Sequence, residues 1–149
     1  MKTLILGLGN PILSDDGIGI RVARELKQKV KDVDVIEASV GGMSLLGHIQ
    51  GYDKLIIVDS IKTEKGNPGD VYEMKPEDFV VTMHLSSLHG VNLSSAIELG
   101  RQLGYKIPQT IKIYAIEIED NLTFSERCTE KVEASIPKVV KKIINGEDL

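Results

Sequence analysis

Two uninterrupted apolar runs constrain the fold of this 149-residue sequence more than any other feature: TLILGL at 3–8 and LIIV at 55–58. Runs of this length without polar alternation are typical of strands buried on both faces of a parallel sheet. Such a sheet needs helices on both of its faces. The runs therefore predict an α/β fold in which 3–8 and 54–59 are strands, with 54–59 central in the sheet.

The segments around these runs alternate between helical and extended patterns. We predict helices over 17–30, 43–51, about 86–103 and 126–144, and further strands at 33–39, 71–75 and 110–116. The segment 71–75 (VYEMK) is short and follows a turn-rich loop, which favours an edge strand that runs antiparallel to its neighbour. The order of elements predicts one domain, 1–149, built as a three-layer α/β/α sandwich around about five strands.

Local signals also predict where two of the helices begin and where one bends. Asp15 or Asp16 is placed to cap the first long helix, and Ser125 to cap the last one. Pro137 removes a backbone N–H from the last helix, so we expect a kink or a break there.

Composition excludes several classes of function. The formal net charge is −4, with no Trp and two Phe, so neither a basic patch nor an aromatic platform for nucleic acid is expected. No apolar run approaches the ~20 residues of a membrane-spanning helix, and Asp15 interrupts the N-terminal apolar stretch, which reads as a strand rather than a signal peptide. Cys128 is the single cysteine, which excludes a disulfide framework and favours a reducing, cytoplasmic location.

A glycine-rich turn follows the first strand. Gly7 and Gly9 invite a dinucleotide-binding interpretation, but the fingerprint needs a third glycine where Ile12 stands. Asp15 and Asp16 then occupy the helix start, where a pyrophosphate would need positive potential. The turn therefore favours a cation over an anion, or serves only close packing of the helix.

Three polar side chains, Asp16, Asp59 and His89, each follow a strand-like run and are candidates for a shared site. Two carboxylates and one imidazole suit a divalent transition ion such as zinc, nickel or manganese. Structural alternatives exist: helix capping for the aspartate pair, and bonding to loop N–H groups for Asp59. His84 competes with His89 for the same role.

Other residues have weaker claims to chemistry. His48 lies in a short amphipathic helix pattern and is expected at the surface, and Cys128 reads as a small buried residue rather than a nucleophile. The sequence has no Gly-x-Ser-x-Gly elbow, so acyl-enzyme hydrolysis has little support.

The segments GLGNPILSDDGIGIR, IIVDSI, GGMSLLG and SSLHGVNL together resemble the hydrogenase maturation endopeptidases, which process the large subunit of nickel-iron hydrogenases. The most specific part is G-x-G-N-x-x-x-x-D-[DE]-G-[IV]-G at 7–19. The resemblance implies a mixed, mostly parallel five-stranded sheet in a three-layer sandwich, with 71–75 as its antiparallel strand.

The resemblance also implies roles for individual residues. Asp16, Asp59 and His89 match the positions that bind a divalent ion in the family, although Asp16 stands where many members have Glu. Glu37 matches a position, often Asp in an Asp-Gly-Gly motif, that is linked to cleavage; here the segment reads Glu-Ala-Ser. Asp16, Asp59 and Glu37 are thus the expected catalytic residues of an aspartyl-type endopeptidase.

The implied reaction removes a C-terminal extension from the large-subunit precursor after nickel insertion. The substrate supplies the nickel, other divalent ions such as zinc or cadmium can occupy the site in vitro, and no organic cofactor is expected. The expected partner is the precursor, with neither nucleic acid nor membrane. Two alternatives stay open: a peptidyl-tRNA hydrolase-like esterase, which shares the Gly-Leu-Gly-Asn-Pro start, and a non-catalytic metal-dependent assembly module.

Overall fold

The computed structural model describes residues 1–39, 43–78, 82 and 93–149. Within these residues one five-stranded sheet has the order β2-β1-β3-β5-β4. Its strands are β1 (Thr3–Leu8), β2 (Asp34–Ala38), β3 (Lys54–Ile61), β4 (Val71–Met74) and β5 (Thr110–Glu117). All neighbouring pairs are parallel except β4 and β5, which are antiparallel. The predicted mixed sheet and its one antiparallel edge strand are therefore confirmed.

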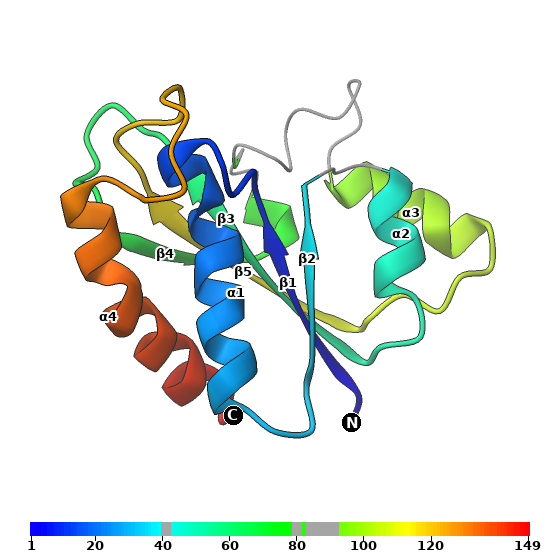
Figure 1. Cartoon of the computed structure of the whole chain (residues 1–149). Coiled ribbons are helices and arrows are strands. Elements are labelled where there is room, and N and C mark those ends of the chain that lie inside the picture. The colour runs from blue at the N-terminus through cyan, green and yellow to red at the C-terminus, as the bar shows by residue number, and fades with distance from the viewer. Residues whose placement is uncertain (40–42, 79–81, 83–92) are drawn as a thin grey trace.

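Helices cover both faces of the sheet (Figure 1). The helices α1 (Ile18–Lys29) and α4 (Glu130–Glu147) pack on one face, and α2 (Met43–Ile49) and α3 (Leu93–Gln102) on the other. Two short 3-10 helices, η1 (Ser14–Gly17) and η2 (Pro76–Asp78), follow β1 and β4. In the part of the chain that the structure describes, no helix combines the length and the apolarity needed to cross a bilayer.

Each face of the sheet has its own hydrophobic core, as expected when consecutive side chains of a strand point to opposite faces. In β3, Leu55 and Ile57 lie in the core under α2 and α3, whereas Ile56 and Val58 lie in the core under α1 and α4. All four side chains are fully buried. This explains why the run 55–58 has no polar alternation.

Two glycines bring α1 close to the ends of the central strands. A Cβ atom on Gly19 would lie 2.4 Å from both the Leu8 and the Val58 carbonyl oxygens, and one on Gly7 would lie 2.6 Å from the Cβ of Ala23. Any larger residue would push the start of α1 off the sheet. The predicted close packing of the helix against the glycine-rich turn is thus confirmed, and it leaves the cation interpretation of the turn untested.

Two predicted helix caps are wrong. The residue that precedes α1 is Gly17, which has no side chain to cap with, and α4 begins at Glu130 after Thr129 rather than after Ser125. Ser125 instead forms a β-bridge with Leu13, so a tertiary contact holds it outside the helix.

Pro137 does not break the last helix. It lies inside α4, which continues from Glu130 to Glu147. The apolar side chains on both sides of Pro137, including the fully buried Val132 and Val139, pack into one core against the sheet. This packing outweighs the loss of one helical hydrogen bond.

Candidate functional site

The strand order creates a switch point at the carboxyl edge of the sheet. From β1 the chain passes through α1 to β2 on one side, and from β2 it passes through α2 to β3 on the other side of β1. Connections that diverge to opposite faces leave a crevice at the carboxyl ends of the two central strands, where ligands of α/β proteins bind. Asp16 follows β1 and Asp59 lies near the end of β3, so the structure places both at this edge.

Asp59 lies inside β3 rather than just beyond it. The strand continues to Ile61 because it pairs with β5 up to Glu117, and Asp59 lies opposite Ala115. The Asp59 side chain is fully buried; it accepts hydrogen bonds from the Ser60 N–H at 2.7 Å and from the Thr82 hydroxyl at 2.6 Å. A carboxylate held at both oxygens has a defined orientation, as a metal ligand or catalytic acid requires.

Asp16 lies in η1, directly above the end of β1. Its Oδ2 accepts a hydrogen bond from the Asn10 N–H at 2.9 Å, and its side chain is buried. Gly9, with a φ of +148°, lets the chain pass so close that a Cβ atom there would lie 2.2 Å from the Asp16 carbonyl oxygen. The glycine-rich turn thus allows the backbone at Asp16 to pack closely against the end of β1.

Asp15 has different hydrogen-bond partners from its neighbour Asp16. Its carboxylate accepts four hydrogen bonds: from the N–H groups of Glu119 and Asp120, and from both the N–H and the hydroxyl of Thr129. Thr129 is the residue that precedes α4. Asp15 therefore ties η1 to the start of α4 and to the end of β5, and the adjacent aspartates have different environments.

Glu37 does not join this site. Its neighbours in β2 show that it faces α1, because Ile36 packs on the α2 and α3 side of the sheet. Its carboxylate forms a two-pronged ion pair with Arg24 of α1, at 2.9 and 3.1 Å, and is partly exposed. Asp59, in contrast, shares its face with Leu55 and Ile57, the opposite side of the sheet.

The predicted histidine ligand cannot be placed, because His89 and its competitor His84 lie outside the described residues. His48 is exposed near the end of α2, as predicted. Among residues 1–39, 43–78, 82 and 93–149, no three Asp, Glu, His or Cys side chains form a group that could hold a metal ion. Asp16 and Asp59 offer oxygen ligands, so a complete site needs at least one donor from elsewhere.

The sequence patterns did not indicate Glu117, another buried acid at this edge. It ends β5 on the same face as Asp59, since Ile61 lies opposite it. Its carboxylate accepts hydrogen bonds from the Thr63 N–H and hydroxyl and from the Tyr72 hydroxyl. Glu117 therefore holds the loop between β3 and β4. In the sequence Glu117 stands between Ile116 and Ile118, as a polar residue of an alternating strand does, and this pattern does not indicate that Glu117 is buried or binds a loop.

Buried acids are concentrated at the carboxyl edge. The described residues include five buried Asp or Glu side chains; four of them belong to this edge and one to the opposite edge: Asp15, Asp16, Asp59 and Glu117, then Glu147. Such a concentration of carboxylates in a low-dielectric environment favours a cation and disfavours an anion. The prediction that this turn does not bind phosphate agrees with that distribution.

Cys128 is not a nucleophile at neutral pH. Burial raises the pKa of its thiol to about 12, and its Sγ lies 3.9 Å from the Ser14 carbonyl oxygen. At pH 7 the reactive thiolate is therefore a negligible fraction of the total. Cys128 packs against the core under α1 and α4, as a packing residue should, but it is partly rather than fully buried.

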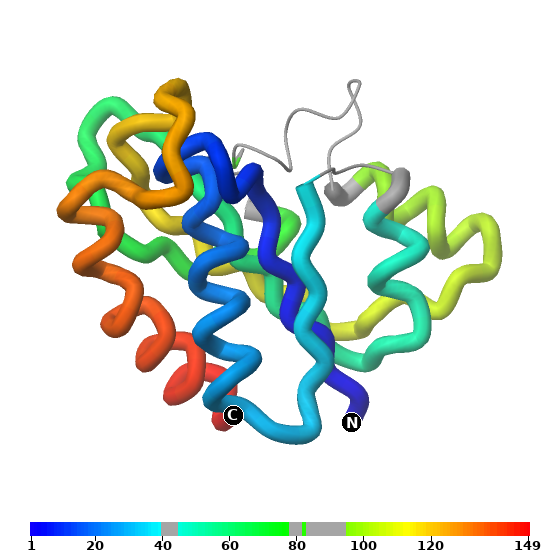
Figure 2. The backbone as a smooth tube through the Cα atoms, viewed as in Figure 1, coloured from blue at the N-terminus to red at the C-terminus, as the bar shows by residue number. Residues whose placement is uncertain are grey.

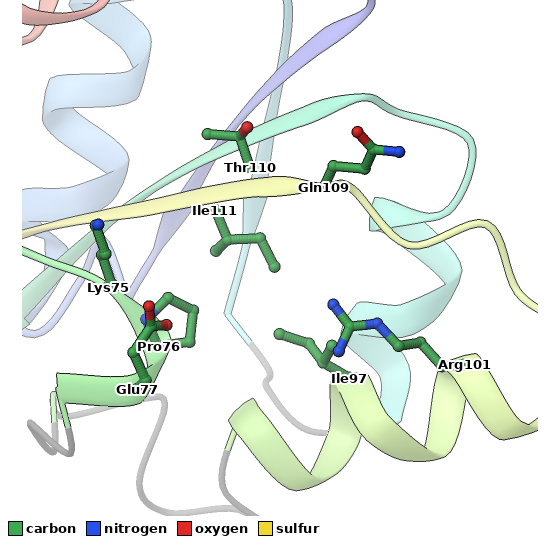
Figure 3. A pocket seen from close by; sticks show the side chains of 8 residues that line it. All are labelled: Lys75, Pro76, Glu77, Ile97, Arg101, Gln109, Thr110 and Ile111. Atoms are coloured by element: carbon green, nitrogen blue, oxygen red, sulfur yellow. The ribbon is translucent and has the colours of Figure 1, made fainter.

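Two cavities lie away from these acids. One, of about 400 Å³, lies between η2, α3 and the start of β5 (Figure 3) and is lined by Lys75, Pro76, Glu77, Ile97, Arg101, Gln109, Thr110 and Ile111. The other, of about 520 Å³, is a groove between α1 and α4 with Ile136, Val140 and Ile144 among its lining residues. Neither Asp16 nor Asp59 lines either of these two cavities. The candidate site is therefore identified by its buried carboxylates at the switch point and not by the size of a cavity.

Comparison with known proteins agrees with the fold and with the motifs. The family model described as hydrogenase maturation protease matches residues 20–146. The hydrogenase 2 maturation protease of Escherichia coli K12 is 29% identical over 148 residues, covering 97% of this chain and 89% of the relative. Protein FrxA of Pyrococcus furiosus is 27% identical over 138 residues, covering 89% and 96%.

A solved structure extends this agreement to three dimensions. The hydrogenase maturating endopeptidase HybD from E. coli superimposes with a TM-score of 0.81 at 27% identity, over 99% of this chain and 93% of that one. The whole sheet and the flanking helices are therefore shared with a structurally known peptidase.

Proposed function

This chain belongs to the hydrogenase maturation protease family and is a peptidase, and on that basis we propose that it removes the C-terminal extension of a nickel-iron hydrogenase large-subunit precursor after nickel insertion. The single cysteine, which forms no disulfide framework, supports a reducing cytoplasmic site for the reaction. The partner in this proposal is the precursor itself.

One observation carries the proposal: Asp16 and Asp59 lie at the carboxyl edge of β1 and β3, where the chain connections diverge to opposite faces of the sheet. Asp16 is held by the Asn10 N–H, and Asp59 by Ser60 and Thr82. These hydrogen bonds fix the orientation of each carboxylate, as a metal ligand requires. Both carboxylates therefore have the fixed orientation that a cation ligand needs.

We propose that this cation is the substrate's nickel, contacted by Asp16, Asp59 and His89. Carboxylate and imidazole ligands suit a divalent ion of the first transition row, and zinc or cadmium would compete for the same donors. Nickel held there supplies a Lewis acid beside the scissile peptide bond. The chain contributes the fixed orientation of the two carboxylates and, by burying them, the exclusion of water around the ion.

The experiment compares nickel-loaded and nickel-free precursor. We expect purified protein to shorten the C-terminus of the nickel-loaded precursor, measured by intact mass spectrometry, and to leave the nickel-free precursor unchanged. An unchanged mass for the nickel-loaded form, with an active control protease in parallel, would reject cleavage and favour a non-catalytic assembly role. Release of free tRNA from peptidyl-tRNA would favour the esterase alternative.

The histidine assignment has a matched pair of variants. His89→Ala should abolish processing and weaken binding of nickel alone, measured by calorimetry, whereas His84→Ala should retain both. The reverse result would assign the contact to His84. Full activity in both variants would remove histidine from the proposed site.

A further inference from the structure

The loop between β5 and α4, residues 118–129, exposes two large apolar side chains. Leu122 is 80% exposed and Phe124 is 82% exposed, and Ile12 in the turn after β1 is 50% exposed. Single exposed apolar residues are common on protein surfaces, but neighbouring ones of this size mark interaction sites. We name Ile12, Leu122 and Phe124 the apolar patch.

Ile12 lies in a turn that pairs with the loop carrying Leu122 and Phe124, although more than 100 residues separate the two segments in sequence. The Ser125 N–H donates to the Ile12 carbonyl at 2.9 Å, and the Ser14 N–H donates to the Ser125 carbonyl at 2.9 Å. Figure 2 shows the orange loop against the blue turn, at the carboxyl edge of the sheet. The patch therefore lies at the same edge as Asp16.

Hydrogen bonds hold the backbone that presents the patch. The Asp120 carboxylate accepts from the N–H groups of Leu122 and Thr123 and from the Thr123 hydroxyl. Asp15 accepts from the Asp120 N–H and, at the other end of the loop, from Thr129. A loop fixed at its tip and at both ends keeps Leu122 and Phe124 in water, which costs hydrophobic free energy unless a partner covers them.

The position of the patch next to the candidate site indicates which partner covers it. Asp15 holds the loop that carries Leu122 and Phe124, and the next residue, Asp16, belongs to the candidate site, so the patch adjoins a proposed contact to nickel. A second copy of this chain seated there would occupy the edge that a protein substrate must approach. We infer that the apolar patch docks an apolar surface of the folded precursor and so aligns its C-terminal segment with Asp16; this inference rests on the proposed function.

The test is a comparison of two double variants of the full-length protein. Leu122→Ser with Phe124→Ser removes most of the patch; Leu103→Ser with Tyr105→Ser removes a similar pair, 57% and 40% exposed, beyond the end of α3. With nickel-loaded precursor, we expect the first variant to raise KM at least about tenfold at unchanged kcat, as for a lost binding hot spot. The control variant should keep both constants.

Each outcome has one meaning. If the native protein cleaves the precursor and the patch variant has an unchanged KM, the docking inference is wrong while the proposed function stands. If the native protein does not cleave, the proposed function fails instead. Self-association in sedimentation that the patch variant alone abolishes, with KM unchanged, would make a second copy the occupant and overturn the inference. Phe124→Gln alone provides a second test should the double variant unfold.

Discussion

The two edges of the sheet hold their buried acids by different means. At the amino edge, Glu147 at the end of α4 accepts from Lys54 at 2.6 Å, from Lys112 at 3.0 Å and from the Tyr114 hydroxyl at 2.5 Å. At the carboxyl edge, Asp16 and Asp59 accept from backbone N–H groups and a hydroxyl. The two lysines form ion pairs with Glu147, whereas the N–H and hydroxyl donors described at Asp16 and Asp59 fix the orientation of each carboxylate.

The comparison predicts that charge at one edge serves activity and charge at the other serves stability. Asp59→Asn keeps the shape and an acceptor for the Ser60 N–H, but it removes the charge. We expect processing of the precursor to fall by roughly 1,000-fold, because the proposed contact between this carboxylate and the nickel loses its charge. Asp16→Asn should behave similarly in the same mass-spectrometric assay.

The matched control is Glu147→Gln at the amino edge, which should process the precursor at the native rate. Circular dichroism checks that the Asp59→Asn protein is folded. Native activity in a folded Asp59→Asn protein would show that the charge at the carboxyl edge is not needed for processing.

Asp15→Ala should cause the largest loss of stability. It leaves four donors on Glu119, Asp120 and Thr129 without their acceptor, and buried groups that lose partners are costly. We expect the free energy of unfolding in urea to fall by about 3 kcal/mol or more.

The control for that variant is Asp34→Ala, which loses a single hydrogen bond from the Tyr52 hydroxyl at an exposed position. It should cost less than about 1 kcal/mol. Equal losses from the two variants would show that the clamp between η1 and α4 is unimportant.

Glu147→Gln should cost about 2 kcal/mol at pH 7, because it leaves Lys54 and Lys112 facing a neutral side chain. Burial raises the pKa of Glu147, but the hydrogen bonds from Lys54, Tyr114 and Lys112 outweigh this effect and hold the pKa below its ordinary 4.5. A depressed pKa in the folded state gives stability that is complete above pH 4.5 and lost as the pH falls through the folded value.

Urea titrations between pH 7 and pH 3 measure that dependence. The native protein should lose stability below pH 4.5 more steeply than Glu147→Gln, so the two curves should converge in acid. If the two curves of unfolding free energy against pH stay parallel over this range, Glu147 does not contribute to the pH dependence of stability.

The smallest effect is expected for Glu37→Ala. Its ion pair with Arg24 is partly exposed, and the hydrogen bond with Glu37, opposed by slight burial, raises the pKa of Arg24. Exposed pairs contribute about 0.5 kcal/mol, and we expect a loss of that size with processing retained, because Glu37 faces α1 rather than Asp59. A large loss of processing without loss of stability would instead support the catalytic role that the family resemblance implies.

Much of the architecture was predictable because it depends on local patterns. The apolar runs and the helical spacing predicted the order of strands and helices, and the short turn-flanked segment 71–75 predicted the antiparallel edge, which the structure places at Val71–Met74. Helix starts were not predictable in the same way. Ser125 has the right residue type for a cap, but its bridge to Leu13 depends on a segment more than 100 residues away.

The sequence by itself determined the fold class, the family resemblance and the placement of Asp16 and Asp59 at the carboxyl edge of parallel strands, because strand periodicity and a 13-residue motif are local properties of the chain. Only the tertiary structure showed the different hydrogen-bond partners of Asp15 and Asp16, placed Glu37 on the opposite face from Asp59, and showed Glu117 and the apolar patch at the same edge of the sheet. Hydrogen-bond partners and exposure depend on which distant segments of the chain meet in the fold. Two adjacent aspartates such as Asp15 and Asp16 have nearly the same local sequence, so only those distant contacts give them different environments.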